Sequence, residues 1–202
     1  MRQRGFTLIE LMVAMTILVL LMVAAMPGLG TWLDNTRIRN EGDSIVNGLQ
    51  TARAEAVRRN ANVSFWLVKL TNPAALGNDC SLLSTSGSWM VSISNPENQC
   101  AADATSTDST VNPAGVIAGR PMGSDSTHVA VDAKKSDGTA GTVVTFNGFG
   151  RVSNSAAITA VSLNGTGSGT YRNLRVVVST TGAVRLCDPA LSSTGTDPRR
   201  CY

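Results

Sequence analysis

One acidic residue, Glu10, lies at the start of an apolar segment that carries no second charge until Asp34. Residues 11–27 read LMVAMTILVLLMVAAMP, and the segment stays largely apolar as far as Leu33. This exceeds the roughly 20 residues that a membrane-spanning helix requires, so we expect the chain to meet a membrane. Because an ionised carboxylate at mid-bilayer costs about 2.5 to 3.5 kcal/mol, Glu10 should be neutral, paired with a cation, or functional.

Two arginines, Arg2 and Arg4, precede this segment. A basic stretch before an apolar core is also typical of a secretory signal peptide. Such a signal has a shorter core followed by a small-residue cleavage site, whereas here the helical pattern continues past Pro27. We expect the arginines to hold the N-terminus on the cytoplasmic side, which places the chain after Trp32 outside.

The run GFTLIEL at residues 5–11 resembles the class III signal of type IV pilins and type II secretion pseudopilins. The resemblance implies that residues 1–5 form a leader peptide, that a prepilin peptidase cuts after Gly5, and that the new N-terminal residue, Phe6, is methylated. It also implies a single-pass protein of the bacterial inner membrane with a periplasmic head, which is later incorporated into a pilus or pseudopilus.

Cleavage after Gly5 would leave a cationic amine on Phe6, close to Glu10. If two such helices stack with a stagger, the Glu10 of one chain meets the amine of its neighbour, and the two charges cancel. Such a pair is stronger in low dielectric than in water, so it would fix the register between subunits. In the family this glutamate recruits the subunit into the filament; the alternative is a carboxylate that sits protonated in lipid.

We expect one long helix, with a transmembrane and assembly part over residues 6–33 and an amphipathic continuation over residues 34–60. Pro27 lacks the N–H that bonds one turn back, and glycines follow it, which predicts a kink or local unwinding. One face of the continuation is apolar at helical spacing: Ile38, Ile45, Leu49, Ala52 and Ala56. The other face should be solvated or contact other subunits: Arg37, Arg39, Glu41, Asp43, Arg53, Glu55, Arg58 and Arg59.

Residues 61–202 should form a β-rich periplasmic head. Short β-type runs are separated by Gly, Ser, Thr, Asn and Pro: residues 63–70, 89–94, 129–132, 142–146, 158–163, 174–179 and 183–187. No alternation of strands and helices occurs, which argues against a doubly wound nucleotide-binding fold. The prediction is therefore an α+β, type IV pilin-like fold, with the helix packed on an antiparallel sheet. Two polar segments, 72–87 and 95–115, are expected to be exposed loops.

All four cysteines, Cys80, Cys100, Cys187 and Cys201, lie in the predicted external head, where an oxidising compartment favours disulfides. Four cysteines allow three pairings, and locality suggests Cys80 with Cys100 and Cys187 with Cys201. A metal site is not expected, because the sequence has no C-x-x-C and a single histidine, His128.

No catalytic motif occurs: G-x-S-x-G, H-E-x-x-H and P-loop spacings are all missing from the sequence. The glycines of residues 148–150 and 165–169 are typical of turns rather than of phosphate-binding loops, because neither group opens a helix. We therefore expect a non-enzyme that needs no cofactor.

The strands from residue 142 onward resemble those of FimT/FimU-type minor pilins and of the H-type pseudopilin of type II secretion. The resemblance implies a low-abundance subunit that starts filament assembly with other minor pilins and sits near the tip. Its partners would be other minor pilins, the major pilin or pseudopilins, the prepilin peptidase and the assembly platform. An H-type pseudopilin and a major pilin remain as alternatives.

A DNA-binding minor pilin for natural transformation is the alternative of a different class. Some FimT-like members carry Gly-Arg-x-Arg in the closing hairpin, but residues 182–185 here read GAVR, so only Arg185 matches. Of 17 basic residues two leave with the leader, which leaves 15 against 14 acidic ones. DNA binding would then need a local patch, for which Arg185, Arg199 and Arg200 are the candidates.

Overall fold

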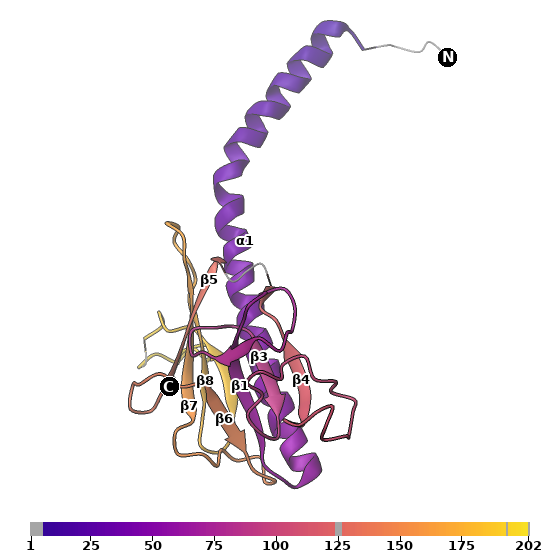
Figure 1. Ribbon diagram of the computed structural model, residues 1–202. Coiled ribbons are helices and arrows are strands. Elements are labelled where there is room, and N and C mark those ends of the chain that lie inside the picture. The colour runs from indigo at the N-terminus through magenta and orange to yellow at the C-terminus, as the bar shows by residue number, and fades with distance from the viewer. Residues whose placement is uncertain (1–5, 124–126, 193, 202) are drawn as a thin grey trace, which may run out of the picture.

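A computed structural model describes residues 6–123, 127–192 and 194–201, with the side chains of residues 24–29 not described. The predicted cleavage residue Gly5 lies outside the described residues. One long helix, α1 (Leu8–Arg59), extends from a β-rich head (Figure 1). The strands are β1 (Val63–Leu70), β2 (Cys80–Leu82), β3 (Trp89–Ser92), β4 (Val116–Arg120), β5 (Val129–Lys135), β6 (Val143–Phe146), β7 (Ile158–Gly165), β8 (Leu174–Val178) and β9 (Val184–Cys187).

Helix α1 has polar residues at both ends that satisfy its free backbone groups. The side chain of Thr7 accepts a hydrogen bond from the Glu10 N–H at 3.3 Å, which is an N-cap contact. Asn60 adopts the left-handed conformation, with φ of 49°, and its N–H bonds to carbonyls of the last turn, which ends the helix. The helix therefore ends where the sequence predicts.

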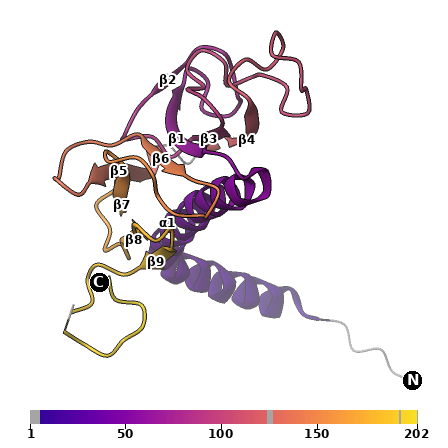
Figure 2. The same ribbon diagram turned by 90° about the horizontal axis from the view of Figure 1, so that it is seen from below.

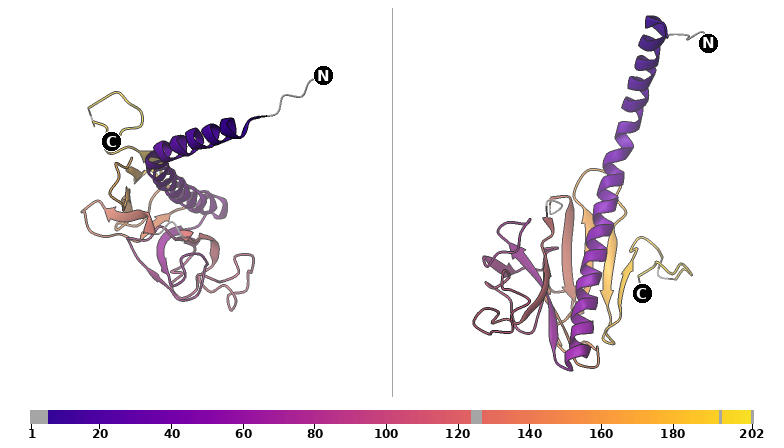
Figure 3. Two further views of the ribbon diagram at one scale, coloured as in Figure 1. Left: turned by 90° about the horizontal axis from the view of Figure 1, so that it is seen from above. Right: turned by 90° about the vertical axis from the view of Figure 1, so that its right-hand side faces the viewer.

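The backbone stays helical through Pro27, so the local unwinding expected as one possibility is not found. The two halves of α1 nevertheless point in different directions, as the views along the molecule show (Figures 2 and 3). That Pro27 causes this bend remains a prediction. Across the described residues, no helix combines the length and the apolarity needed to cross a membrane.

The head contains two antiparallel sheets where the sequence predicted one. In the first, the strand order is β2-β1-β3-β4, and β6 also pairs with β1. In the second, the order is β5-β7-β8-β9. Phe65 in β1 lies between Val91 of β3 and Val144 of β6, which fixes the register of the first sheet.

The C-terminal half of α1 packs across both sheets (Figure 3). The predicted apolar face is the buried face, since its five residues are at most 1% exposed: Ile38, Ile45, Leu49, Ala52 and Ala56. Gly48 allows the close approach, because a Cβ there would lie 2.7 Å from the Phe65 ring and 2.8 Å from the Trp89 ring. The Trp89 indole donates to Ser44 Oγ at 2.9 Å, which satisfies a buried donor.

One expectation about exposure is wrong, and a second holds only in part. Glu41, assigned to the charged outer face, is only 4% exposed and lies against Gly87 and Met122. The segments 72–87 and 95–115 are not simply exposed loops, because β2 pairs with the end of β1 and both segments contribute to a second apolar cluster. The disulfide between them holds this cluster together, and polar composition alone gave no sign of it.

Candidate assembly site

The N-terminal half of α1 presents an apolar surface that the head does not cover. From Phe6 to Val23, every large apolar side chain is between 49% and 84% exposed. The head lies only against the other half of the helix (Figure 1). An apolar surface of this extent marks a region that contacts a membrane or other proteins.

Glu10 lies within this surface, in the first turn of α1. It shares a shallow groove with Phe6 and with apolar side chains further along the helix: Leu11, Ala14, Met15 and Leu18. A carboxylate in the first turn is favoured by the positive end of the helix dipole. Chemically, this carboxylate can accept a cationic partner supplied by a second chain within an otherwise apolar contact.

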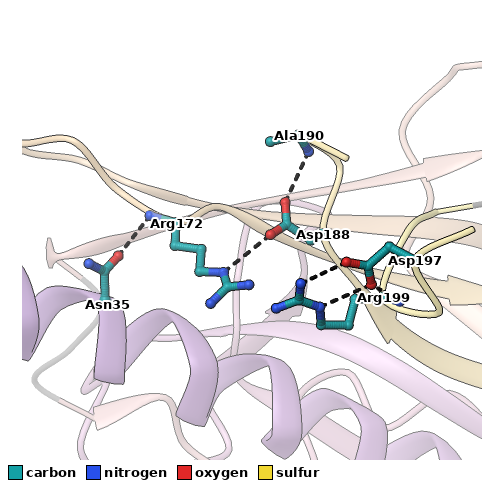
Figure 4. A network of polar contacts seen from close by, with 6 residues as sticks. All are labelled: Asn35, Arg172, Asp188, Ala190, Asp197 and Arg199. Atoms are coloured by element: carbon teal, nitrogen blue, oxygen red, sulfur yellow. Dashed lines mark hydrogen bonds and ion pairs between the residues drawn. The ribbon is translucent and has the colours of Figure 1, made fainter. Parts of the chain in front are cut away.

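The C-terminal loop is tied to the head by a disulfide and by an ion pair. Cys187 at the end of β9 bonds to Cys201, 14 residues further on, with an S–S distance of 2.02 Å. Asp188 accepts from Arg172 Nε at 3.2 Å, and the Arg172 N–H donates to Asn35 Oδ1 on α1 at 2.7 Å (Figure 4). The loop, the β7–β8 connection and α1 are thus joined where the helix leaves the head.

The other disulfide joins Cys80 of β2 to Cys100, with an S–S distance of 2.03 Å. Both sulfurs are buried in the second apolar cluster. The structure therefore contains the two local pairs, and none of the described cysteines is free.

The three candidate DNA-contacting arginines lie near one another, but two of them already donate hydrogen bonds, one to a backbone carbonyl and one to an acidic side chain. Arg185 donates to the carbonyl of Arg200 at 3.2 Å. Arg199 makes a two-pronged contact with Asp197, at 3.0 and 2.7 Å (Figure 4). The Arg199 hydrogen bond lowers the pKa of Asp197 to about 2, so this carboxylate stays charged and offsets the arginine at neutral pH. This loop carries mixed charge rather than a basic stripe.

His128 does not form part of a metal cluster among the described residues. Its Nδ1 lies 3.4 Å from Asp34, which also pairs with Arg37 at 2.8 Å. This contact joins the start of β5 to α1.

Sequence reasoning did not identify the Asn35–Arg172–Asp188 connection. The three residues are separated by up to about 150 positions in a chain of 202, and none belongs to a motif. Only the fold brings them together, so the sequence holds no local signal for this contact.

An overhanging apolar helix with a carboxylate in its first turn, joined to an antiparallel head, defines the class of pilin and pseudopilin filament subunits. The chain belongs to the family described as type II transport protein GspH, which matches residues 41–182. The prokaryotic N-terminal methylation motif matches residues 1–26. Membership implies a structural subunit that is anchored in the inner membrane and assembles with other pilins or pseudopilins.

Two crystal forms of the type IV minor pilin FimU from Pseudomonas aeruginosa are similar to this chain. The first is 12% identical, covers 85% of this chain and 99% of that chain, and gives a TM-score of 0.46. The second is 14% identical, covers 81% and 99%, and gives a TM-score of 0.44. No curated protein matches the chain in sequence.

Proposed function

We propose that this chain is a minor type IV pilin that starts pilus assembly together with other minor pilins, at or near the filament tip. The observation that carries the proposal is the uncovered apolar half of α1, in which the large apolar side chains from Phe6 to Val23 are at least 49% exposed. Such a surface is stable only in lipid or among other helices of the same kind. The chain would move from the membrane into the filament during assembly.

Before assembly, the helix spans the inner membrane once, with the head in the periplasm. The apolar sequence that begins at Leu11 continues to Leu33, long enough for one crossing. A prepilin peptidase removes residues 1–5 after Gly5 and methylates Phe6, and an assembly platform then extracts the subunit. The cleavage and methylation steps are supported by the methylation motif at residues 1–26.

During assembly, Glu10 pairs with the Phe6 amine of an adjacent subunit and sets the register of the two helices. Its place in the apolar groove of the first turns supports this role. Once lipid is replaced by other helices, an unpaired carboxylate there would be strongly disfavoured, so the pairing selects one stagger.

A second candidate is an H-type pseudopilin of type II secretion, favoured by the family description that covers residues 41–182. The helix would act in the same way in both machines. The DNA-binding alternative has less support, because Arg199 is paired with Asp197 and Arg185 is bonded to a carbonyl.

The test is a strain that lacks this chain, scored together for surface pili, twitching, protein secretion and DNA uptake. Loss of pili with normal secretion is the expected result. Loss of secretion alone would replace the minor pilin by the pseudopilin. Intact pili and secretion with lost DNA uptake would contradict both and direct attention to Arg185, Arg199 and Arg200.

A further inference from the structure

The end of the head opposite the apolar half of α1 presents an exposed aromatic side chain, Phe149. It lies in the connection between β6 and β7 and is 86% exposed, more than any other large apolar side chain described. Val57, in the last turns of α1, is 52% exposed and lies beside the same connection, since a Cβ on Gly150 would be 3.2 Å from Val57 Cγ2. We call the surface formed by residues 53–59, 147–151 and 179–182 the distal surface (Figure 1).

The backbone around Phe149 is held rigidly. Asn147 Oδ1 accepts from the N–H of Phe149 at 3.0 Å and of Arg151 at 3.1 Å. Arg53 Nε on α1 donates to the Gly150 carbonyl at 3.0 Å, and Gly182 packs directly against that carbonyl. A pre-organised loop loses little conformational freedom on binding, which is the property expected of an interface anchor.

The distal surface is also basic. It contains four arginines and one acidic residue: Arg53, Arg58, Arg59, Arg151 and Glu55. Glu55 is already bonded to Arg58 at 2.6 Å and to Arg59 at 2.9 Å. The surface therefore combines exposed apolar side chains with a net positive charge, and apolar residues accompanied by polar ones are the arrangement of protein–protein interfaces.

We propose that the distal surface docks onto the head of another pilin-like subunit, placed one position nearer the filament tip, with Phe149 in an apolar pocket whose rim is acidic. This rests on the proposed function, because lipid or other helices cover the opposite end of α1 and the distal surface then faces along the filament. A lone exposed phenylalanine would need no partner. Here it is rigid, adjoins Val57 and lies on a surface of net positive charge, and the partner must complement all three features.

The experiment places a photo-reactive amino acid at Thr180, which is exposed on the distal surface, in the full-length chain in cells that express the assembly machinery. We expect an adduct with a protein that mass spectrometry identifies by its own N-terminal methylation motif. Phe149→Ser should reduce the adduct by about tenfold or more, as loss of an aromatic anchor does. Leu83→Ser is the matched control, because Leu83 is also an exposed apolar residue, 36% exposed, but lies beside Leu70 at the end of β1 away from the distal surface, and should leave the yield unchanged.

A second photo-reactive residue, at Leu18, distinguishes failure of the docking proposal from failure of the proposed function. If the Leu18 probe reacts with pilin-like chains and the Thr180 probe does not, the docking proposal is wrong and the proposed function stands. If neither probe reacts with such chains, both are wrong. An adduct from Thr180 with a protein that lacks the methylation motif, or equal yields for the Phe149 and Leu83 variants, would also overturn the docking proposal.

Discussion

Two glutamates on α1 have opposite surroundings. Glu10 lies in the overhanging apolar half, whereas Glu41 is 4% exposed between the helix and the head. The sequence singled out Glu10 because it opens an apolar segment that carries no other charge until Asp34. The sequence pattern wrongly assigned Glu41 to the outer face, because charged residues flank it. The segments around Gly87 and Met122 bury Glu41 by packing against the helix.

Glu10→Ala and Glu10→Gln are both expected to be processed and inserted in the membrane but to fail in assembly. Breaking a pair of buried charges costs about 3 to 5 kcal/mol, which would reduce incorporated subunits by more than about tenfold. N-terminal mass spectrometry, membrane fractionation and recovery of pili or secretion in the deletion strain measure these steps. Thr16→Ala is the control, since that hydroxyl only bonds back to Val13 within the helix. Normal assembly of the Gln variant would show that charge pairing is not required.

Glu55 should contribute to stability in a pH-dependent way. Its hydrogen bond from Arg58, and then that from Arg59, lower its pKa from 4.5 to about 2. The folded pKa is depressed, so the stabilisation is complete above about pH 4.5 and disappears as the pH falls towards 2. Solvent screening keeps the effect under about 1 kcal/mol. Unfolding of the detergent-solubilised chain should therefore depend less on pH across this window in Glu55→Gln; identical pH dependence of variant and wild type would contradict the assignment.

At the scale of elements, the sequence predicts the helix and most strands, because their side chains are apolar at regular spacing. All seven expected strands are present, β1 with the expected ends and the other six with shifted ends, and the helix ends at Arg59 as expected. The strands that were missed are β2 and β4. Strand β2 has three residues inside a polar segment, and β4 contains Gly119, so neither has a recognisable pattern. The division into two sheets depends on pairing between strands that are far apart in the sequence, so no local pattern predicts it.

The turn between β8 and β9 requires a glycine at position 182. Gly182 and Gly138 both have positive φ, of 83° and 80°, but only Gly182 packs against another segment, the Gly150 carbonyl. Gly138→Ala should therefore cost only backbone strain, about 1 to 2 kcal/mol. Gly182→Ala should cost a further amount of about 1 to 3 kcal/mol, because its methyl group overlaps the carbonyl. Denaturant unfolding measures both changes in stability. Equal losses of stability would show that the Gly182 turn moves away from the Gly150 carbonyl without cost.

At the scale of the whole molecule, α1 divides the chain into two regions with different requirements. Its C-terminal half completes the core of the head with residues such as Ile45 and Leu49, which are at most 1% exposed. Its N-terminal half contributes nothing to that core and leaves its apolar side chains uncovered. The folded head thus displays a helix that is not stable in water and that must be covered by lipid or by like helices.

Filament assembly through the uncovered half of α1 is tested most directly by a photo-reactive amino acid at Leu18 in the wild-type cellular background. Adducts are then identified by mass spectrometry before and after the assembly motor is inactivated. If α1 assembles with like helices, we expect adducts with other chains that carry the N-terminal methylation motif, and a strong decrease in those adducts when the motor is inactive. Adducts with lipid alone, or with proteins that lack the motif, would contradict this expectation.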